Sequence, residues 1–295
     1  MTEYAYGLLH GVDQENRVLA IKSNRRIKFF YLARGMFASF MDYFRPGIYV
    51  YLHVNTQSKS YRGYRVQNVV NIDKVLAPRR QRPTVYYDVS LIKAGIRTIV
   101  NAERPKLFLD FEMSMPPFRN YENFVSEIIQ IGLVLTDHQG GLLEQYTAFI
   151  KPKLHPISER TERFLKVTKE EIASGVAYEE IHDLLARIQS TFKPMVFIWG
   201  KNDEIELGKM NRLYNLGDFT RRMQFIDLLK MHKTYFGLKN DLGLFNAYNM
   251  YAADDLDKQK HDALQDALVT MKVFFWFREV ANDRLEVALP TGVDG

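Results

Sequence analysis

Two acidic side chains lie in one strand-like segment of the chain, where they could bind a divalent cation. Asp110 and Glu112 belong to the run LFLDFEM, and alternation along a strand sends both carboxylates to the same face. Two like charges at that position repel each other and lose hydration. A divalent cation would relieve both costs, whereas a solvated strand end is the commoner explanation of an isolated D-x-E pair.

A third carboxylate follows a second apolar segment. Asp203 comes shortly after the run MVFIWG, whose length and composition are those of a buried strand. Open α/β sheets bind ligands beyond the carboxyl ends of such strands. An acid in the first turn of a helix is the alternative explanation of Asp203.

The segment HDALQDA supplies a histidine and a fourth carboxylate. Its apolar spacing predicts an amphipathic helix over residues 261–280, with His261 and Asp266 separated by about 140° around the axis. The two side chains would therefore flank a cleft. The small residues Ala263 and Ala267 would let this helix approach the sheet closely.

Together, the four carboxylates and the imidazole have no simple structural explanation. Hard oxygen ligands suit Mg²⁺ or Mn²⁺, and two such ions roughly 3.5–4 Å apart can clamp the attacking and leaving oxygens of a phosphodiester. An imidazole with a pKa of about 6.5 can deprotonate the attacking water near neutral pH. The set therefore predicts two-metal phosphodiester cleavage.

The bulk composition is that of a globular protein with two domains. The chain has 295 residues, of which 46% are hydrophobic and 25% charged. No run of 18 apolar residues and no signal-peptide pattern occurs, so we expect a cytoplasmic protein without a membrane partner. The absence of cysteine excludes disulfides, thiolate zinc sites and cysteine nucleophiles.

Charge is divided unevenly along the chain. Residues 1–100 hold 16 Lys and Arg against 6 Asp and Glu, a net charge of +10, which leaves −5 for residues 101–295. The basic part also contains 15 of the Phe and Tyr residues. Cationic charge among aromatic rings is typical of surfaces that neutralise phosphates and stack bases. Alternatively, the aromatic residues form only the core of a solvated barrel.

We expect four segments of the chain. Residues 1–75 contain strand-like runs at 17–22, 27–32, 48–54 and 64–70, separated by turn-forming residues, and are predicted to form a basic, OB-like β-barrel that binds nucleic acid. Residues 76–105 are predicted to be an extended linker and a connecting helix. Residues 106–282 form the domain that carries the acidic residues, and residues 283–295 a tail.

The third segment alternates strands and helices. Strands are expected at residues 107–113, 128–137, 144–152, 195–200 and 225–227, and helices near 158–164, 178–191, 203–214 and 261–280. This order is typical of an α/β fold with a mixed sheet and helices on its faces.

The segment that carries the acidic residues resembles a known family. The runs LFLDFEMSM, FVSEIIQIGLVLTD, FLKVTKEEI, MVFIWGKND and KHDALQDALVTMKVF are similar, in order and spacing, to the DEDDh exonucleases of the DnaQ-like, ribonuclease H-fold superfamily. The resemblance covers about residues 106–280. It is nearest to the branch with histone-mRNA 3′ exonucleases and bacterial KapD-like proteins.

The resemblance implies a role for each residue of the acidic set. Asp110 would bridge two ions of Mg²⁺ or Mn²⁺, Glu112 and Asp266 would bind the catalytic-site ion, and Asp203 the other, partly through water. His261 would be the general base. His261 in place of a tyrosine is the feature that distinguishes the DEDDh class.

Three residues next to this set are candidates for contact with the terminal nucleotide. Phe111 and Met113 could line its base pocket, although packing at the strand edge is an equal alternative. Ser114 stands where the family usually has threonine and retains a hydroxyl.

The implied activity is 3′→5′ hydrolysis of single-stranded RNA or DNA to 5′-mononucleotides, with RNA or short RNA favoured. A regulator that binds nucleic acid without cleaving it, and a DNA-proofreading subunit, are the alternatives.

Overall fold

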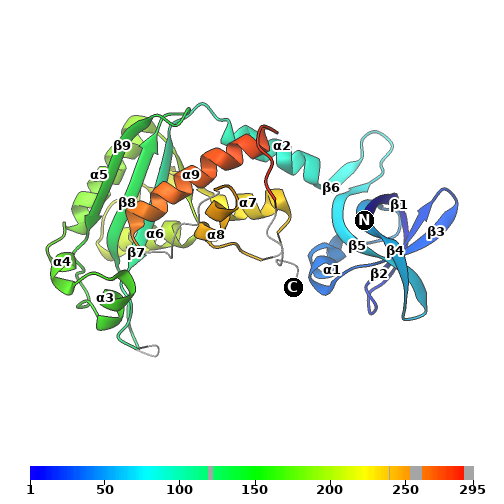
Figure 1. The fold of residues 1–295 in the computed structure, drawn as a ribbon, viewed down its shortest axis with the longest axis horizontal. Helices are drawn as coiled ribbons and strands as arrows, with labels where there is room; N and C mark the ends of the chain where they lie inside the picture. Colours follow the sequence, from blue (N-terminus) through cyan, green and yellow to red (C-terminus); the bar gives the residue numbers. More distant parts are fainter. Residues whose placement is uncertain (119–121, 239, 253–260, 289–295) are drawn as a thin grey trace. The chain divides into compact units, whose positions relative to one another are not determined.

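The computed structural model describes residues 1–118, 122–238, 240–252 and 261–288 (Figure 1). The chain divides into two compact units, Met1–Gly95 and Ile96–Gly295. Helix α2 (Val89–Val100) contains the boundary between them. This helix occupies the segment for which a connecting helix was predicted.

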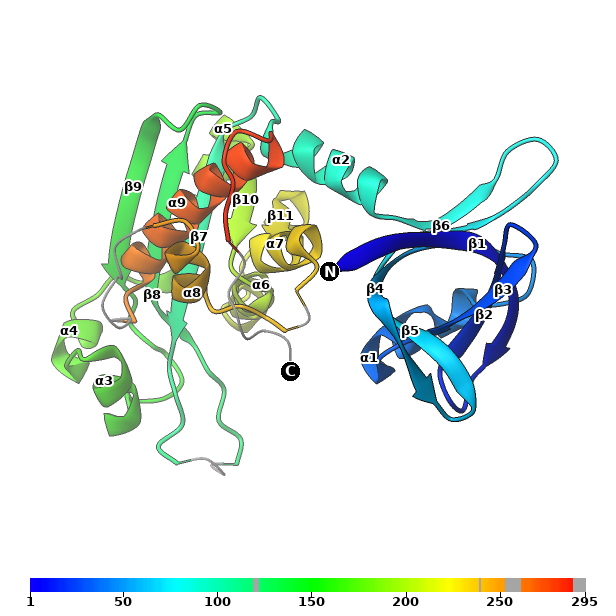
Figure 2. The same cartoon turned by 45° about the vertical axis from the view of Figure 1, so that its right-hand side comes forward.

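The first unit contains a closed five-stranded β-barrel (Figure 2). Neighbouring strands are antiparallel in the order β3-β2-β1-β4-β5, and parallel pairing between β3 and β5 closes the barrel. A sixth strand, β6, extends the sheet beside β5, and helix α1 connects β3 to β4. The bounds are β1 (Thr2–Asp13), β2 (Val18–Ser23), β3 (Arg26–Tyr31), α1 (Arg34–Phe40), β4 (Tyr49–Tyr61), β5 (Tyr64–Ala77) and β6 (Thr84–Asp88).

The expected β-rich first domain is confirmed, but its strands are longer and more numerous than predicted. Strand β6 lies inside the segment 76–105, for which the sequence predicted linker and helix. Strand β1 was not predicted because Gly7 and Gly11 interrupt its pattern. Gly7 is required there, since a Cβ would lie 2.4 Å from the carbonyl oxygen of Lys22 on β2.

The second unit is built on a five-stranded mixed sheet in the order β11-β10-β7-β8-β9. Strands β7, β10 and β11 are parallel, whereas β8 is antiparallel to both β7 and β9. The bounds are β7 (Lys106–Met113), β8 (Ile128–Thr136), β9 (Leu142–Phe149), β10 (Met195–Ile198) and β11 (Gln224–Asp227). The mixed sheet predicted from the sequence is confirmed.

Helices cover both faces of this sheet: α9 lies on one face and α5 on the other (Figure 1). The bounds are α3 (Glu159–Leu165), α4 (Lys169–Ala173), α5 (Tyr178–Phe192), α6 (Asn202–Leu213), α7 (Leu228–Phe236), α8 (Leu244–Asn249) and α9 (Ala263–Ala281). The sequence analysis did not predict α4, α7 and α8. In the part of the chain that the structure describes, no helix has the length and apolarity needed to cross a bilayer.

The side chains of the central strand β7 alternate between the two faces of the sheet. Leu107, Leu109 and Phe111 point into the core shared with α5 and α6. The ring of Phe108 points to the other face, where it contacts Phe274 of α9. Residues i and i+2 of a strand share a face, so Asp110 and Glu112 lie on the α9 side.

Candidate active site

The face of the sheet under α9 is shaped by the register of β7 and β8. Asp110 lies directly opposite Gly132, and Glu112 directly opposite Gln130. A Cβ on Gly132 would lie 2.1 Å from backbone atoms of Ala263, so the glycine is what lets the start of α9 rest on β8. The close approach that Ala263 suggested in the sequence therefore depends on a glycine in the facing strand.

The start of α9 is held by side chains on both sides of the contact. Asp262 is the N-cap residue and accepts a hydrogen bond from the backbone N–H of Gln265. The side-chain amide of Gln130 donates to Asp262 and its carbonyl accepts from the N–H of Ala263. The prediction that His261 lies on the helix was wrong, because the Asp262 cap is extended and His261 precedes it.

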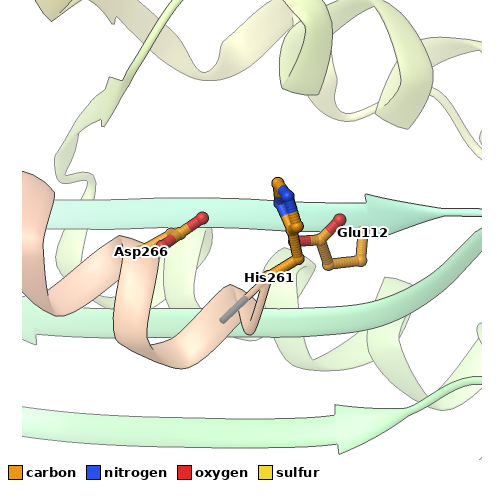
Figure 3. Close-up of side chains that lie close together, drawn as sticks. All are labelled: Glu112, His261 and Asp266. Carbon is orange, nitrogen blue, oxygen red and sulfur yellow. The ribbon is translucent and has the colours of Figure 1, made fainter. Parts of the chain in front are cut away.

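Despite this change, the structure brings His261, Glu112 and Asp266 together. These three residues offer ligand atoms that all lie within 4.8 Å of one another (Figure 3). Glu112 comes from β7 and Asp266 from the first turn of α9, while His261 is contributed by the segment that leads into that helix. Residues far apart in sequence thus form one candidate metal-binding group.

Asp203, on α6, lies near this group and repels the carboxylate of Glu112. It lies in the first turn of that helix, and its Oδ1 accepts a hydrogen bond from the backbone N–H of Phe111 at 3.1 Å. Because Phe111 stands between Asp110 and Glu112, this bond fixes the helix to the strand that carries the first acidic pair. Both interpretations of Asp203 in the sequence apply, since it begins a helix and also faces the acidic strand.

The four carboxylates perturb one another. Burial, with repulsion from Asp203, Asp266 and Glu112, raises the pKa of Asp110 well above its usual range. Burial and repulsion from the other acids likewise raise the pKa of Glu112 to about 8. The pKa of Asp203 is raised chiefly by burial, against the lowering effect of its backbone hydrogen bonds.

This donor set fits divalent metal ions. Among the described residues, no lysine or arginine forms an ion pair with Asp110, Glu112 or Asp203. Buried carboxylates that repel each other and lack a cationic side chain are the groups that Mg²⁺ or Mn²⁺ would neutralise, since both prefer oxygen ligands.

His261 and Glu112 are neighbours but are not hydrogen-bonded to each other. The Nδ1 atom of His261 lies 3.9 Å from Oε1 of Glu112, which is too long for a hydrogen bond. An ion pair would raise the pKa of His261 and lower that of Glu112. Instead, burial and the nearby Lys166 charge lower the pKa of His261, and that of Glu112 is raised. The lowered pKa of His261 favours the neutral imidazole, the form that can accept a proton.

Phe164 is a part of the site that the sequence analysis missed. Its ring, on α3, is stacked on the imidazole of His261 with 3.8 Å between the centroids. The ring of Phe164 covers one face of the imidazole. The side chain of His261 is still 30% exposed, so the imidazole remains accessible to solvent. Nothing in the spacing of residues 158–164 could have indicated this pairing, because it joins segments about a hundred positions apart.

The three predicted substrate contacts occupy different surroundings. Phe111 is only 3% exposed and belongs to the core, which agrees with the packing alternative. Met113 is partly buried against that core. The Oγ of Ser114 accepts a hydrogen bond from the N–H of Glu127 at 2.9 Å. Contact of these residues with a terminal nucleotide stays a prediction.

Known proteins match the second unit of the chain. A family model described as "Exonuclease" (RNase_T) matches residues 107–274, more than half of the chain. The probable 3′-5′ exonuclease KapD of Bacillus subtilis (strain 168) is 29% identical over 170 residues, which are 57% of this chain and 82% of that protein. These findings confirm the resemblance to the DEDDh exonucleases.

Solved structures share the fold at low sequence identity. The nuclease domain of 3′hExo, described as a DEDDh family member bound to rAMP, has a TM-score of 0.51 and 16% identity over 64% of this chain and 98% of that chain. A full-length 3′-exonuclease has a TM-score of 0.53 and 15% identity over 64% of this chain and 88% of that chain. A 3′-exonuclease described in 3′-end-specific recognition of a histone mRNA stem-loop has a TM-score of 0.52 and 14% identity over 63% and 85%.

Proposed function

The chain belongs to the exonuclease family that matches residues 107–274, and we propose that it removes nucleotides from the 3′ ends of single-stranded nucleic acids in a metal-dependent reaction. The observation that carries this proposal is the group formed by Glu112, Asp266 and His261, next to which lie the mutually repelling carboxylates of Asp110 and Asp203. The 3′→5′ direction is proposed from the KapD relative, which is a probable 3′-5′ exonuclease.

The four carboxylates would hold the metal, and we propose two ions per site. When bound, Mg²⁺ or Mn²⁺ would supply the positive charge that activates water and stabilises the phosphodiester as it is cleaved. His261 would accept a proton from the attacking water, because its lowered pKa favours the neutral imidazole. The water oxygen would bond to phosphorus while the bond between phosphorus and the 3′ oxygen of the preceding nucleotide breaks. The terminal residue would leave as a 5′-mononucleotide, and the 3′ oxygen would take up a proton to become the 3′ hydroxyl of the shortened strand.

RNA or short RNA is the substrate proposed first. Two proteins of the same fold are described with rAMP and with an mRNA stem-loop. We also propose that the barrel of residues 1–75 binds the strand, since its net charge compensates for the acidic second unit. Its strand order, with a helix between the third and fourth strands, supports an OB-like barrel.

A degradation assay tests the activity. A 5′-labelled single-stranded oligonucleotide should shorten stepwise from its 3′ end with Mg²⁺ or Mn²⁺, and EDTA should stop the reaction. RNA and DNA of equal sequence, from two to about thirty nucleotides, measure the substrate preference. Strand binding without metal-dependent shortening would support the alternative of a non-catalytic regulator.

Substitutions test the residue assignments. Asp110→Ala and Asp266→Ala should each abolish hydrolysis and leave folding and strand binding largely intact. Asp218→Ala removes an acid outside the site, one that bonds with Thr220, and serves as the matched control. Full activity of either site variant would refute the assignment.

A further inference from the structure

The barrel presents two groups of aromatic rings, and these groups differ in charge. The tyrosine–histidine face consists of Tyr4, Tyr6, Tyr51 and His53, whose rings lie 5.2–6.5 Å apart. The basic aromatic face is formed by the end of β3, the residue before β2 and the β4–β5 hairpin. Its residues are Arg17, Phe29, Tyr31, Lys59, Tyr61 and Tyr64, with Arg62 in the hairpin turn that follows Tyr61.

Ion pairs largely neutralise the tyrosine–histidine face. His53 is 2.9 Å from Asp73. Lys74, whose ammonium lies over the ring of Tyr51, is 2.7 Å from Asp88. A polyanion would therefore have to compete with Asp88 for Lys74 and would also meet the carboxylate of Asp73.

The basic aromatic face keeps its positive charge. No ion pair between described residues includes Arg17, Lys59 or Arg62. The carboxylate that touches this face is Asp13, which accepts a hydrogen bond from the hydroxyl of Tyr64. With that acid included, Arg17, Lys59 and Arg62 leave the face with two net positive charges.

Rings and cations interleave on this face. The rings of Tyr31 and Tyr61 are 4.6 Å apart, and those of Phe29 and Tyr64 are 5.1 Å apart. The Lys59 ammonium lies 5.0 Å from the centre of the Tyr31 ring and 5.9 Å from that of Tyr61.

Hydrogen bonds fix part of the same face. A guanidinium nitrogen of Arg17 donates to the hydroxyls of Tyr31 and Tyr61 at 3.3 and 3.5 Å. This bonding holds the ring pair of β3 and the β4–β5 hairpin in one arrangement, so a ligand would meet rings that are already ordered.

We propose that the basic aromatic face is the site where the barrel holds single-stranded nucleic acid, with bases on its rings and phosphates on Lys59 and Arg62. Aromatic rings stack bases of any sequence, and lysine and arginine neutralise the backbone, so this combination suits a strand without sequence preference. The proposal rests on the proposed function only in taking this strand to be the substrate of the nuclease unit.

Binding of labelled oligonucleotides to the full chain in EDTA tests the site without any cleavage. Tyr31→Ala with Tyr61→Ala should weaken binding of a twelve-nucleotide oligouridine by at least about fivefold. The matched DNA should show a similar loss, because stacking does not depend on the sugar. Tyr6→Ala with Tyr51→Ala, on the tyrosine–histidine face, is the matched control and should change affinity by less than twofold.

A second double variant removes charge and keeps the rings, because the loss of two half-buried rings could unfold the barrel. Lys59→Gln with Arg62→Asn alters exposed positions, and asparagine suits the left-handed backbone of Arg62. The slope of log affinity against log salt should become shallower by about 1.4 for two lost phosphate contacts. Arg79→Gln with Arg80→Gln removes equal charge from the exposed loop before β6 and should leave the slope unchanged.

Each result bears on the site. An unchanged salt slope in the Lys59–Arg62 variant would overturn the proposal, as would a larger loss in the tyrosine–histidine control than in the ring variant. Because binding is measured without metal, a chain that binds through this face but never shortens the strand would contradict the proposed activity and leave this site in place.

Discussion

The ring of Phe164 is stacked on the imidazole of His261, with 3.8 Å between the centroids and 24° between the ring planes. This contact joins α3 to the segment that leads into α9. It shields the proposed base from water on one side, and burial is the main reason why the pKa of His261 is lowered. Phe164 therefore acts as a positioning residue for His261.

Phe164→Ala should lower kcat by about threefold to tenfold while KM changes little, since aromatic stacking is worth about 0.5–1.5 kcal/mol. Hydration of the imidazole should also raise its pKa, so the acidic limb of the kcat/KM profile should move to higher pH. Phe164→Tyr should restore both properties. Phe219→Ala, which removes a ring from His182, is the matched control; an unshifted acidic limb in Phe164→Ala would exclude the positioning role.

Gly132→Ala should displace α9 and so lower both stability and activity. The new methyl group would lie 2.1 Å from the backbone of Ala263, so α9 must move away from β8. Overpacking of this kind costs about 1–3 kcal/mol of stability, and a displacement of about 1 Å at a catalytic group can lower the rate about a hundredfold. Chemical denaturation and the degradation assay measure the two effects.

Gly95→Ala is the matched control for this experiment. Its position in α2 has no atom within 4 Å of the added Cβ, so the change should preserve activity and maintain or raise stability. Wild-type activity in Gly132→Ala would show that α9 does not need this close approach.

Metal ions should stabilise the wild-type fold more than that of Asp110→Asn. In EDTA the variant should be at least as stable as the wild type, because it removes one of the buried carboxylates that repel each other. Mg²⁺ or Mn²⁺ at a hundred times its Kd should stabilise the wild type by about 2.7 kcal/mol, and the variant by much less. Thermal melts with and without metal measure both quantities, and equal metal-induced shifts in the two proteins would contradict Asp110 as a ligand.

Buried His232 should make the fold sensitive to acid. It is fully buried, its Nε2 lies 2.9 Å from the Tyr251 hydroxyl, and burial lowers its pKa from 6.5 to about 4. Below pH 6.5 the unfolded chain binds a proton that the folded chain does not, so stability should fall as the pH decreases from 6.5 to 4. The loss approaches about 3 kcal/mol at the lower limit.

Comparison with His232→Gln isolates this term from the other titrating groups. The difference in unfolding free energy between wild type and variant should shrink as the pH falls through that window. His10→Gln, at an exposed position, is the control. A difference that stays constant between pH 6.5 and 4 would show that His232 is not the source of acid sensitivity.

Much of the second unit was predictable from local patterns. The alternation in LFLDFEM predicted that Asp110 and Glu112 share a face, and the structure has Leu107, Leu109 and Phe111 of β7 in the core on the opposite side. The amphipathic run after Asp262 predicted α9. Alternation and helical periodicity are local consequences of backbone geometry, and the order of the residues therefore carries them.

The sequence by itself determined which residue types could bind metal and which strand and helix would carry them. Only the tertiary structure decided that His261 precedes the α9 cap, that Gly132 admits that helix and that Phe164 covers the imidazole. Each of these depends on contacts between segments distant in the chain. The tertiary structure also decided that β3 pairs with β5 and closes the barrel, because the residue pattern of neither strand specifies its partner.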